Sequence, residues 1–172
     1  MESQKKFTPT FSFELFPPQT QQGVEKLRLT RKQLALFNPK FFSVTFGAGG
    51  STRERTLETV LEIQAEGHVV APHLSCIGST RQNIRAILEK YSQAGIRHIV
   101  ALRGDLPSGM AQAGEFRYAS ELVAFIRQEF GSSFHIEVAA YPEYNPKARS
   151  AQVDFENFKR KVEIGANSAI TQ

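Results

Sequence analysis

The sequence predicts an α/β protein built as a (β/α)₈ barrel, or TIM barrel, here truncated to about six strands and five helices. Strand-like and helix-like segments alternate, and a glycine follows four of the helical segments, at Gly67, Gly95, Gly131 and Gly165. These glycines are 28, 36 and 34 residues apart, which is about the length of one βα unit. Repeated βα units form a parallel sheet, either closed as a barrel or open and doubly wound.

Two further observations favour the barrel over the open sheet. No G-x-G-x-x-G motif follows the first predicted strand, and "GAGGS" at 47–51 imitates such a loop only weakly. Polar residues recur at the C-terminal ends of the predicted strands, where a barrel builds its active site. They are Glu14, Thr45, His73, Asp105, Tyr141 and Gln172. A complete barrel usually needs ~250 residues, so we expect 1–172 to form a single incomplete barrel domain.

Each element follows from a local pattern. Alternating Phe11, Phe13 and Leu15 predict the first strand, and the proline pair after it ends that strand. Later, "GSTR" occurs twice, each time between an apolar strand-like run and a helical pattern. The predicted strands are 7–16, 41–46, 68–77, 96–102, 134–141 and 167–172, and the predicted helices are 23–37, 52–66, 80–94, 116–130 and 150–164.

Composition excludes several classes of function. The net charge of +4 comes with no long basic block, so nucleic-acid binding is not implied. A single cysteine, Cys76, excludes an internal disulfide and fits a reducing compartment. With no signal-peptide-like or membrane-spanning run, we expect a cytoplasmic protein without a membrane partner. The four histidines show no close-spaced ligand pair, so we expect no metal site.

Two acidic residues are candidates for catalysis. Glu14 alternates with the apolar residues of the first strand, so it should face the barrel axis near the rim. Burial there would raise its pKa, as a general acid requires. Asp105 follows the strand 96–102, after Gly104, which allows the backbone to approach a ligand closely. Asp before a proline turn is also common in purely structural loops.

A third candidate is a polar stripe on the helix 150–164. Asp154, Asn157 and Lys161 are spaced i, i+3 and i+7, which places them on one helix face. Spacing alone favours an ordinary solvated face over a binding site.

Six segments, in this order, resemble methylenetetrahydrofolate reductase of the bacterial, flavin-containing type: "FELFPP", "SVTFGAGGSTRERT", "PHLSCIGST", "ALRGDLP", "AAYPE" and "GANSAITQ". The resemblance runs from about Phe11 to Gln172 and agrees with a (β/α)₈ barrel. It implies reduction of 5,10-methylenetetrahydrofolate to 5-methyltetrahydrofolate. It also implies that noncovalent FAD carries the hydride from NADH or NADPH by a ping-pong route, so the expected partners are the folate and NAD(P)H.

The resemblance implies roles for individual residues. Glu14 matches the family's general acid, which protonates N10 when the imidazolidine ring opens to the 5-iminium cation. Asp105 matches an acid near both flavin and folate, and Gln172 matches a folate contact. The positions that match FAD contacts are Thr45, His73, Leu102, Arg103, Gly104, Asp105, Tyr118, Ala119, Tyr141, Asn145, Asp154, Asn157 and Lys161. Many relatives carry His at position 145 and an acid at position 147, where this chain has Asn145 and Lys147.

Two alternatives remain open at the level of the sequence. A non-flavin barrel aldolase or isomerase would need a phosphate site after strands seven and eight, which this sequence does not contain. A catalytically inactive fragment or interaction module would follow from the unpaired edge of a six-stranded sheet. Such an edge should pair with another copy, so we expect a homo-oligomer, or it should belong to a longer protein.

Overall fold

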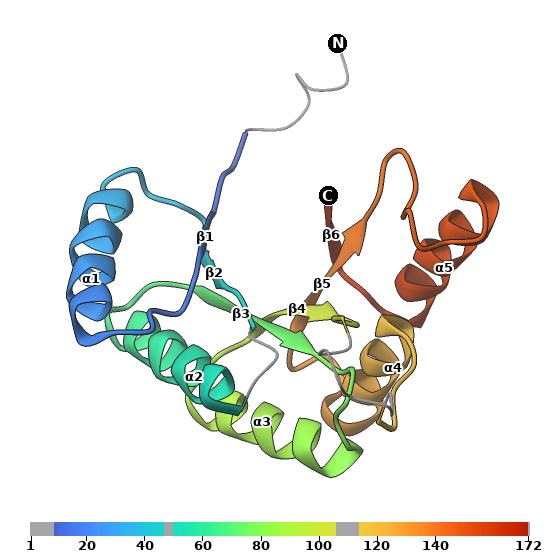
Figure 1. Ribbon diagram of the computed structural model, residues 1–172, viewed down its shortest axis with the longest axis horizontal. Helices are drawn as coiled ribbons and strands as arrows, with labels where there is room; N and C mark the ends of the chain where they lie inside the picture. Colours follow the sequence, from blue (N-terminus) through green and yellow to red (C-terminus); the bar gives the residue numbers. More distant parts are fainter. Residues whose placement is uncertain (1–8, 47–49, 106–113, 172) are drawn as a thin grey trace.

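A computed structural model of the chain describes residues 9–46, 50–105 and 114–171, in which six strands and five helices alternate (Figure 1). The strands are β1 (Phe13–Leu15), β2 (Phe42–Val44), β3 (Val70–Ser75), β4 (His98–Leu102), β5 (His135–Ala140) and β6 (Ser168–Thr171). The helices are α1 (Gln21–Ala35), α2 (Gly50–Ala65), α3 (Arg81–Gln93), α4 (Ala119–Phe130) and α5 (Ala151–Ile164). None of these helices is both long and apolar enough to span a bilayer.

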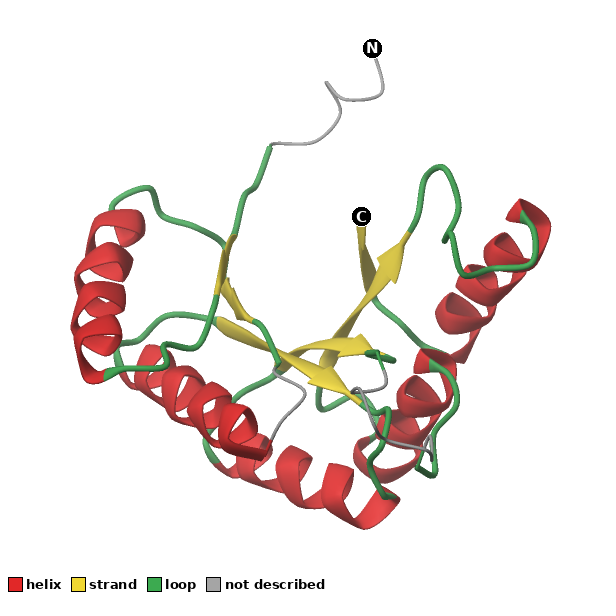
Figure 2. Ribbon diagram, in the orientation of Figure 1, coloured by secondary structure: helices red, strands yellow, loops and turns green. Residues whose placement is uncertain are grey.

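The sheet is parallel throughout, and its strands lie in sequence order from β1 to β6. Figure 2 shows the helices arranged around the outer side of this curved sheet, with the inner side uncovered. Consecutive strands that neighbour one another in parallel, joined by helices on one side, are the construction of a (β/α)₈ barrel. The structure therefore confirms the predicted fold class, an α/β half-barrel.

Alternation along the strands separates the two faces of the sheet. Phe42, Val44 and Leu74 point outward and are fully buried in the core between sheet and helices. A smaller apolar cluster on the inner face contains Phe41 and Ala71, among others. The outward core holds the helices in place, so the inner face and the strand ends are left to carry polar side chains.

Local capping agrees with the sequence pattern. Thr20, Thr80 and Ser150 each accept a hydrogen bond from a backbone N–H in the first turn of α1, α3 and α5. The glycines predicted after α2, α3, α4 and α5 all have positive φ. These residues satisfy exposed backbone groups at the helix ends, which is why the boundaries could be predicted to within a few residues.

Most boundaries lie within two residues of the prediction, but the starts of β1 and α4 differ by more. Strand β1 is much shorter than 7–16, because a strand extends only as far as its partner, and the ladder with β2 begins at Phe13 opposite Phe42. Helix α4 begins at Ala119 and not at 116, because Phe116 is fully buried in the core and the Arg117 N–H is bonded to the Glu121 carboxylate. In both cases a tertiary contact overrides the local pattern.

Candidate active site

A cleft of about 590 Å³ lies at the C-terminal ends of the strands. It brings together every predicted site residue that the structure describes. These residues are Glu14, Thr45, His73, Leu102, Arg103, Gly104, Asp105, Tyr118, Ala119, Tyr141, Asn145, Asp154, Asn157 and Lys161. The remaining predicted residue, Gln172, lies outside the described residues. Parallel strands end at the same edge of a sheet, so residues far apart in sequence meet there.

Glu14 faces the cleft from β1, as predicted, but it is not buried. Its side chain is 50% exposed, which corrects the expectation of a buried carboxylate, because the inner side of the half-barrel is open. Its Oε2 lies 3.4 Å from Nε2 of His73 on β3. The surrounding strands therefore leave the Glu14 carboxyl accessible to water, whereas the sequence predicted that it would be buried.

The side chain of His73, which neighbours Glu14, is almost completely buried. Its Nε2 has no hydrogen-bond partner among the residues that the structure describes. Burial lowers the pKa of the His73 imidazole, although the charges of Glu14 and Glu137 oppose the shift. His73 is therefore neutral at neutral pH, and its ring nitrogen is available to a group bound in the cleft.

Asp105 lies at the mouth of the cleft and pairs with Lys147 on the loop between β5 and α5. The Lys147 ammonium donates to Oδ1 of Asp105 at 2.5 Å. This hydrogen bond and the charge of Lys147 lower the pKa of the Asp105 carboxyl, so Asp105 is ionised near neutral pH. The sequence shows Lys147 only as a difference from relatives. Its pairing with Asp105 could not be predicted, because the two residues are 42 positions apart and share no local pattern.

The polar stripe of α5, formed by Asp154, Asn157 and Lys161, lines the cleft. Lys161 is partly buried, and its Nζ donates to the carbonyl of Ala139 at the end of β5, at 2.6 Å. Burial lowers the pKa of Lys161, while the Asp154 carboxylate opposes the shift. Asp154 in turn accepts from the backbone N–H of Asn145 at 2.9 Å. The stripe thus anchors the loop after β5 and presents an amine to the cleft.

Gly104 is required by its backbone and its neighbours. Its φ is +79°, a conformation that strains other residues. A Cβ at this position would lie 2.9 Å from the Ser75 side chain, so the glycine allows the strand end to pack closely on β3. The group that lies close to the Gly104 backbone is therefore part of the protein, whereas the sequence predicted a ligand there. On one side of Gly104, the Nε of Arg103 is buried without a hydrogen-bond partner in the described part of the chain.

A second cleft, of about 430 Å³, lies between α1 and α2 and is a weaker candidate. Three of the charged residues that line it are already paired within the protein. Arg31, which is nearly fully buried, donates at 2.6 Å to Glu62 and to Glu66, and Arg28 also donates to Glu62. These ion pairs hold the two helices together, so Arg28, Arg31 and Glu62 are less available to a ligand.

Comparison with known proteins agrees with the resemblance seen in the sequence. The family model described as methylenetetrahydrofolate reductase matches residues 1–172. The chain is 48% identical over 162 residues to the 5,10-methylenetetrahydrofolate reductases of Salmonella typhimurium and Escherichia coli, which is 94% of this chain and 53% of each relative. It is 39% identical to methylenetetrahydrofolate reductase (NADH) 1 of Arabidopsis thaliana, in a match that covers 94% of this chain and 30% of that protein.

The extent of these matches fits a half-barrel. The chain spans about half the length of the bacterial relatives, and the matched half contains the cleft described above. The similarity covers nearly the whole chain, because the family model matches residues 1–172 and each of these relatives matches 94% of the chain. This chain therefore belongs to the methylenetetrahydrofolate reductase family.

Proposed function

We propose that this protein is a flavin-dependent reductase that converts 5,10-methylenetetrahydrofolate to 5-methyltetrahydrofolate with NAD(P)H as the electron source. The observation that supports this most directly is the cleft, in which the acids Glu14 and Asp105 share one cavity with the cations Arg103 and Lys161. The bacterial relatives are named as reductases of 5,10-methylenetetrahydrofolate, and the name of the Arabidopsis relative includes NADH.

The residues present fit an anionic flavin cofactor. The Nε of Arg103 is a buried donor without a partner among the described residues, and the Lys161 amine lines the same cleft. Guanidinium and ammonium groups form strong charge-assisted bonds with a diphosphate, so these two residues would hold the diphosphate of FAD. The cleft volume is typical of small-molecule sites. The other predicted cofactor positions would contact the remaining parts of FAD.

When bound, the flavin would supply the hydride, while the chain's own groups would handle protons and charge. Glu14 would donate a proton to N10 of the folate as the ring opens. A neutral His73 assists, because an imidazolium 3.4 Å away would favour the ionised carboxylate and oppose proton donation. The ionised Asp105 would stabilise positive charge that develops on the folate.

The test separates the two half-reactions. The purified protein should show flavin absorbance, or acquire it on incubation with FAD, and NADH should bleach it. In Glu14→Gln, bleaching by NADH should persist while reoxidation by methylenetetrahydrofolate is lost, because an amide cannot donate the required proton. Glu89→Gln, an exposed residue on α3, is the matched control and should behave as the parent protein.

Three results would count against the proposal in different ways. Protein that stays colourless after incubation with FAD would remove the flavin role. Equal loss of both half-reactions in Glu14→Gln would make Glu14 structural. Protein that takes up FAD but never reduces folate would favour the alternative of an inactive part of a longer barrel. The non-flavin aldolase alternative is disfavoured by the family to which the chain belongs.

A further inference from the structure

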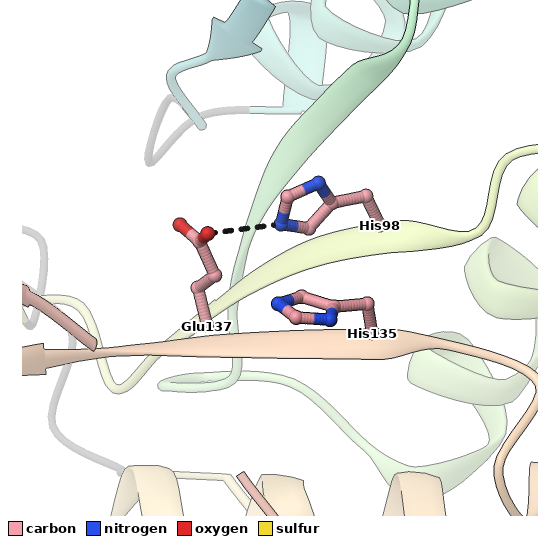
Figure 3. Close-up of side chains that lie close together, drawn as sticks. All are labelled: His98, His135 and Glu137. Carbon is pink, nitrogen blue, oxygen red and sulfur yellow. Dashed lines mark ion pairs between the residues drawn. The ribbon is translucent and has the colours of Figure 1, made fainter. Parts of the chain in front are cut away.

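A second cluster of ligating side chains lies toward the N-terminal ends of β4 and β5, away from the strand ends that line the cleft. His98 is the first residue of β4 and His135 is the first residue of β5, and the two are direct partners across the parallel ladder. Glu137 follows two positions later, on the same face of β5. Figure 3 shows both rings side by side, each turning a nitrogen toward the Glu137 carboxylate.

The distances within this cluster suit a shared cation. One ligating atom from each of the three residues lies within 4.8 Å of the other two, and His98 Nε2 is 3.1 Å from Glu137 Oε1. Around a tetrahedral Zn²⁺ with N and O ligands at ~2.0–2.1 Å, neighbouring ligand atoms are separated by ~3.3 Å. Only small side-chain adjustments would therefore be needed to close the cluster around one ion.

An unsatisfied buried carboxylate points to the same conclusion. Glu137 is only 7% exposed, and its Oε2 has no hydrogen-bond partner among the described residues. His98 Nε2 is likewise buried; it lies 3.1 Å from Glu137 Oε1 but is not aligned for a good hydrogen bond with any described residue. Buried polar atoms in proteins are normally satisfied by protein, water or an ion. A bound cation would satisfy both atoms together.

We propose that His98, His135 and Glu137 bind one divalent transition-metal ion, for which Zn²⁺ is the best match. Two imidazoles and one carboxylate are a common Zn²⁺ donor set, whereas Ca²⁺ and Mg²⁺ prefer oxygen ligands. Ser168 on β6 is hydrogen-bonded to His135 Nε2 at 2.6 Å, so an ion bound by that nitrogen would replace this bond and leave the hydroxyl as a neutral oxygen beside the cluster. The ion would join β4 to β5 from inside the half-barrel, and the site is independent of the proposed reductase activity.

The test is metal binding by the purified protein after a chelator has removed any metal. Zn²⁺ is titrated into the protein against a chromophoric zinc indicator. We expect one ion per chain with a dissociation constant on the order of 1 µM or below. Co²⁺ in place of Zn²⁺ should give the visible absorption of a low-coordinate N/O site, which reports on the ligands without any assay of activity.

Matched variants decide whether the ion uses these residues. His135→Ala and Glu137→Gln should each weaken Zn²⁺ binding at least tenfold, and Glu137→Gln preserves the side-chain shape in case His135→Ala does not fold. His68→Ala is the control, because His68 lies before β3 and outside the cluster. Absence of Zn²⁺ binding below ~10 µM, or binding that both cluster variants retain, would overturn the proposal and leave a buried His–Glu ion pair.

Discussion

The packing at Gly104 allows a quantitative test of the site's architecture. Gly104→Ala introduces two costs. Holding a non-glycine residue at φ +79° costs about 1–2 kcal/mol. Forcing a Cβ to within 2.9 Å of the Ser75 side chain and 3.1 Å of Ile77 adds about 1–3 kcal/mol of overpacking. The variant should therefore lose about 2–5 kcal/mol of unfolding free energy.

The chain offers a control that separates these two costs. Gly67 has a similar φ of +85°, but a Cβ there would meet nothing within 4 Å. Gly67→Ala should therefore lose only about 1–2 kcal/mol, from backbone strain alone. The difference between the two variants isolates the clash with Ser75, and Ser75→Gly in the Gly104→Ala background should recover part of it.

The measurement is urea unfolding followed by circular dichroism, which reports the free energy of unfolding for each variant. Because Gly104 lies between Arg103 and Asp105, Gly104→Ala should also weaken FAD binding, and Gly67→Ala should not. If both variants lose the same free energy, close packing against Ser75 is not what requires glycine at position 104, and the reasoning fails.

Three further predictions follow from the charges and burial of named groups. Lys147→Ala should raise the pKa of Asp105 toward its ordinary value, measured by carboxyl NMR titration, and an unchanged pKa would contradict the ion pair. The pKa of His73 is depressed in the folded state, so the unfolded chain binds more protons and unfolding free energy should fall as pH drops below about 6.5. His73→Gln should reduce this slope, and an unaltered slope would exclude His73 as its source. Burial raises the pKa of Cys76 to about 12, so folded protein should resist thiol reagents at pH 8 until urea unfolds it.

Local patterns were sufficient for most of the fold. Glycines after helices and capping residues before them depend on neighbouring backbone groups, so they could be read from the sequence. The strand ends were predicted less accurately, because the length of β1 depends on which of its residues pair with residues of β2. The resemblance identifies candidate site residues position by position, and their roles stay a prediction. The cleft gathers all of these positions that the structure describes.

Other features could not be predicted from local sequence, because they depend on contacts between distant segments. The exposure of Glu14 depends on how much of the barrel closes over it, and alternation along one strand contains no such information. The pair between Asp105 and Lys147 depends on where two loops converge.

The sequence by itself determined the βα order, most helix ends and the identity of the residues near the strand ends, because each of these depends on a few neighbouring positions. The tertiary structure alone decided which side chains meet. His98 and His135 are 37 positions apart in the sequence, yet the register of β4 on β5 makes them direct partners beside Glu137. Register is set by packing of the whole sheet against its helices, so no short stretch of sequence specifies it.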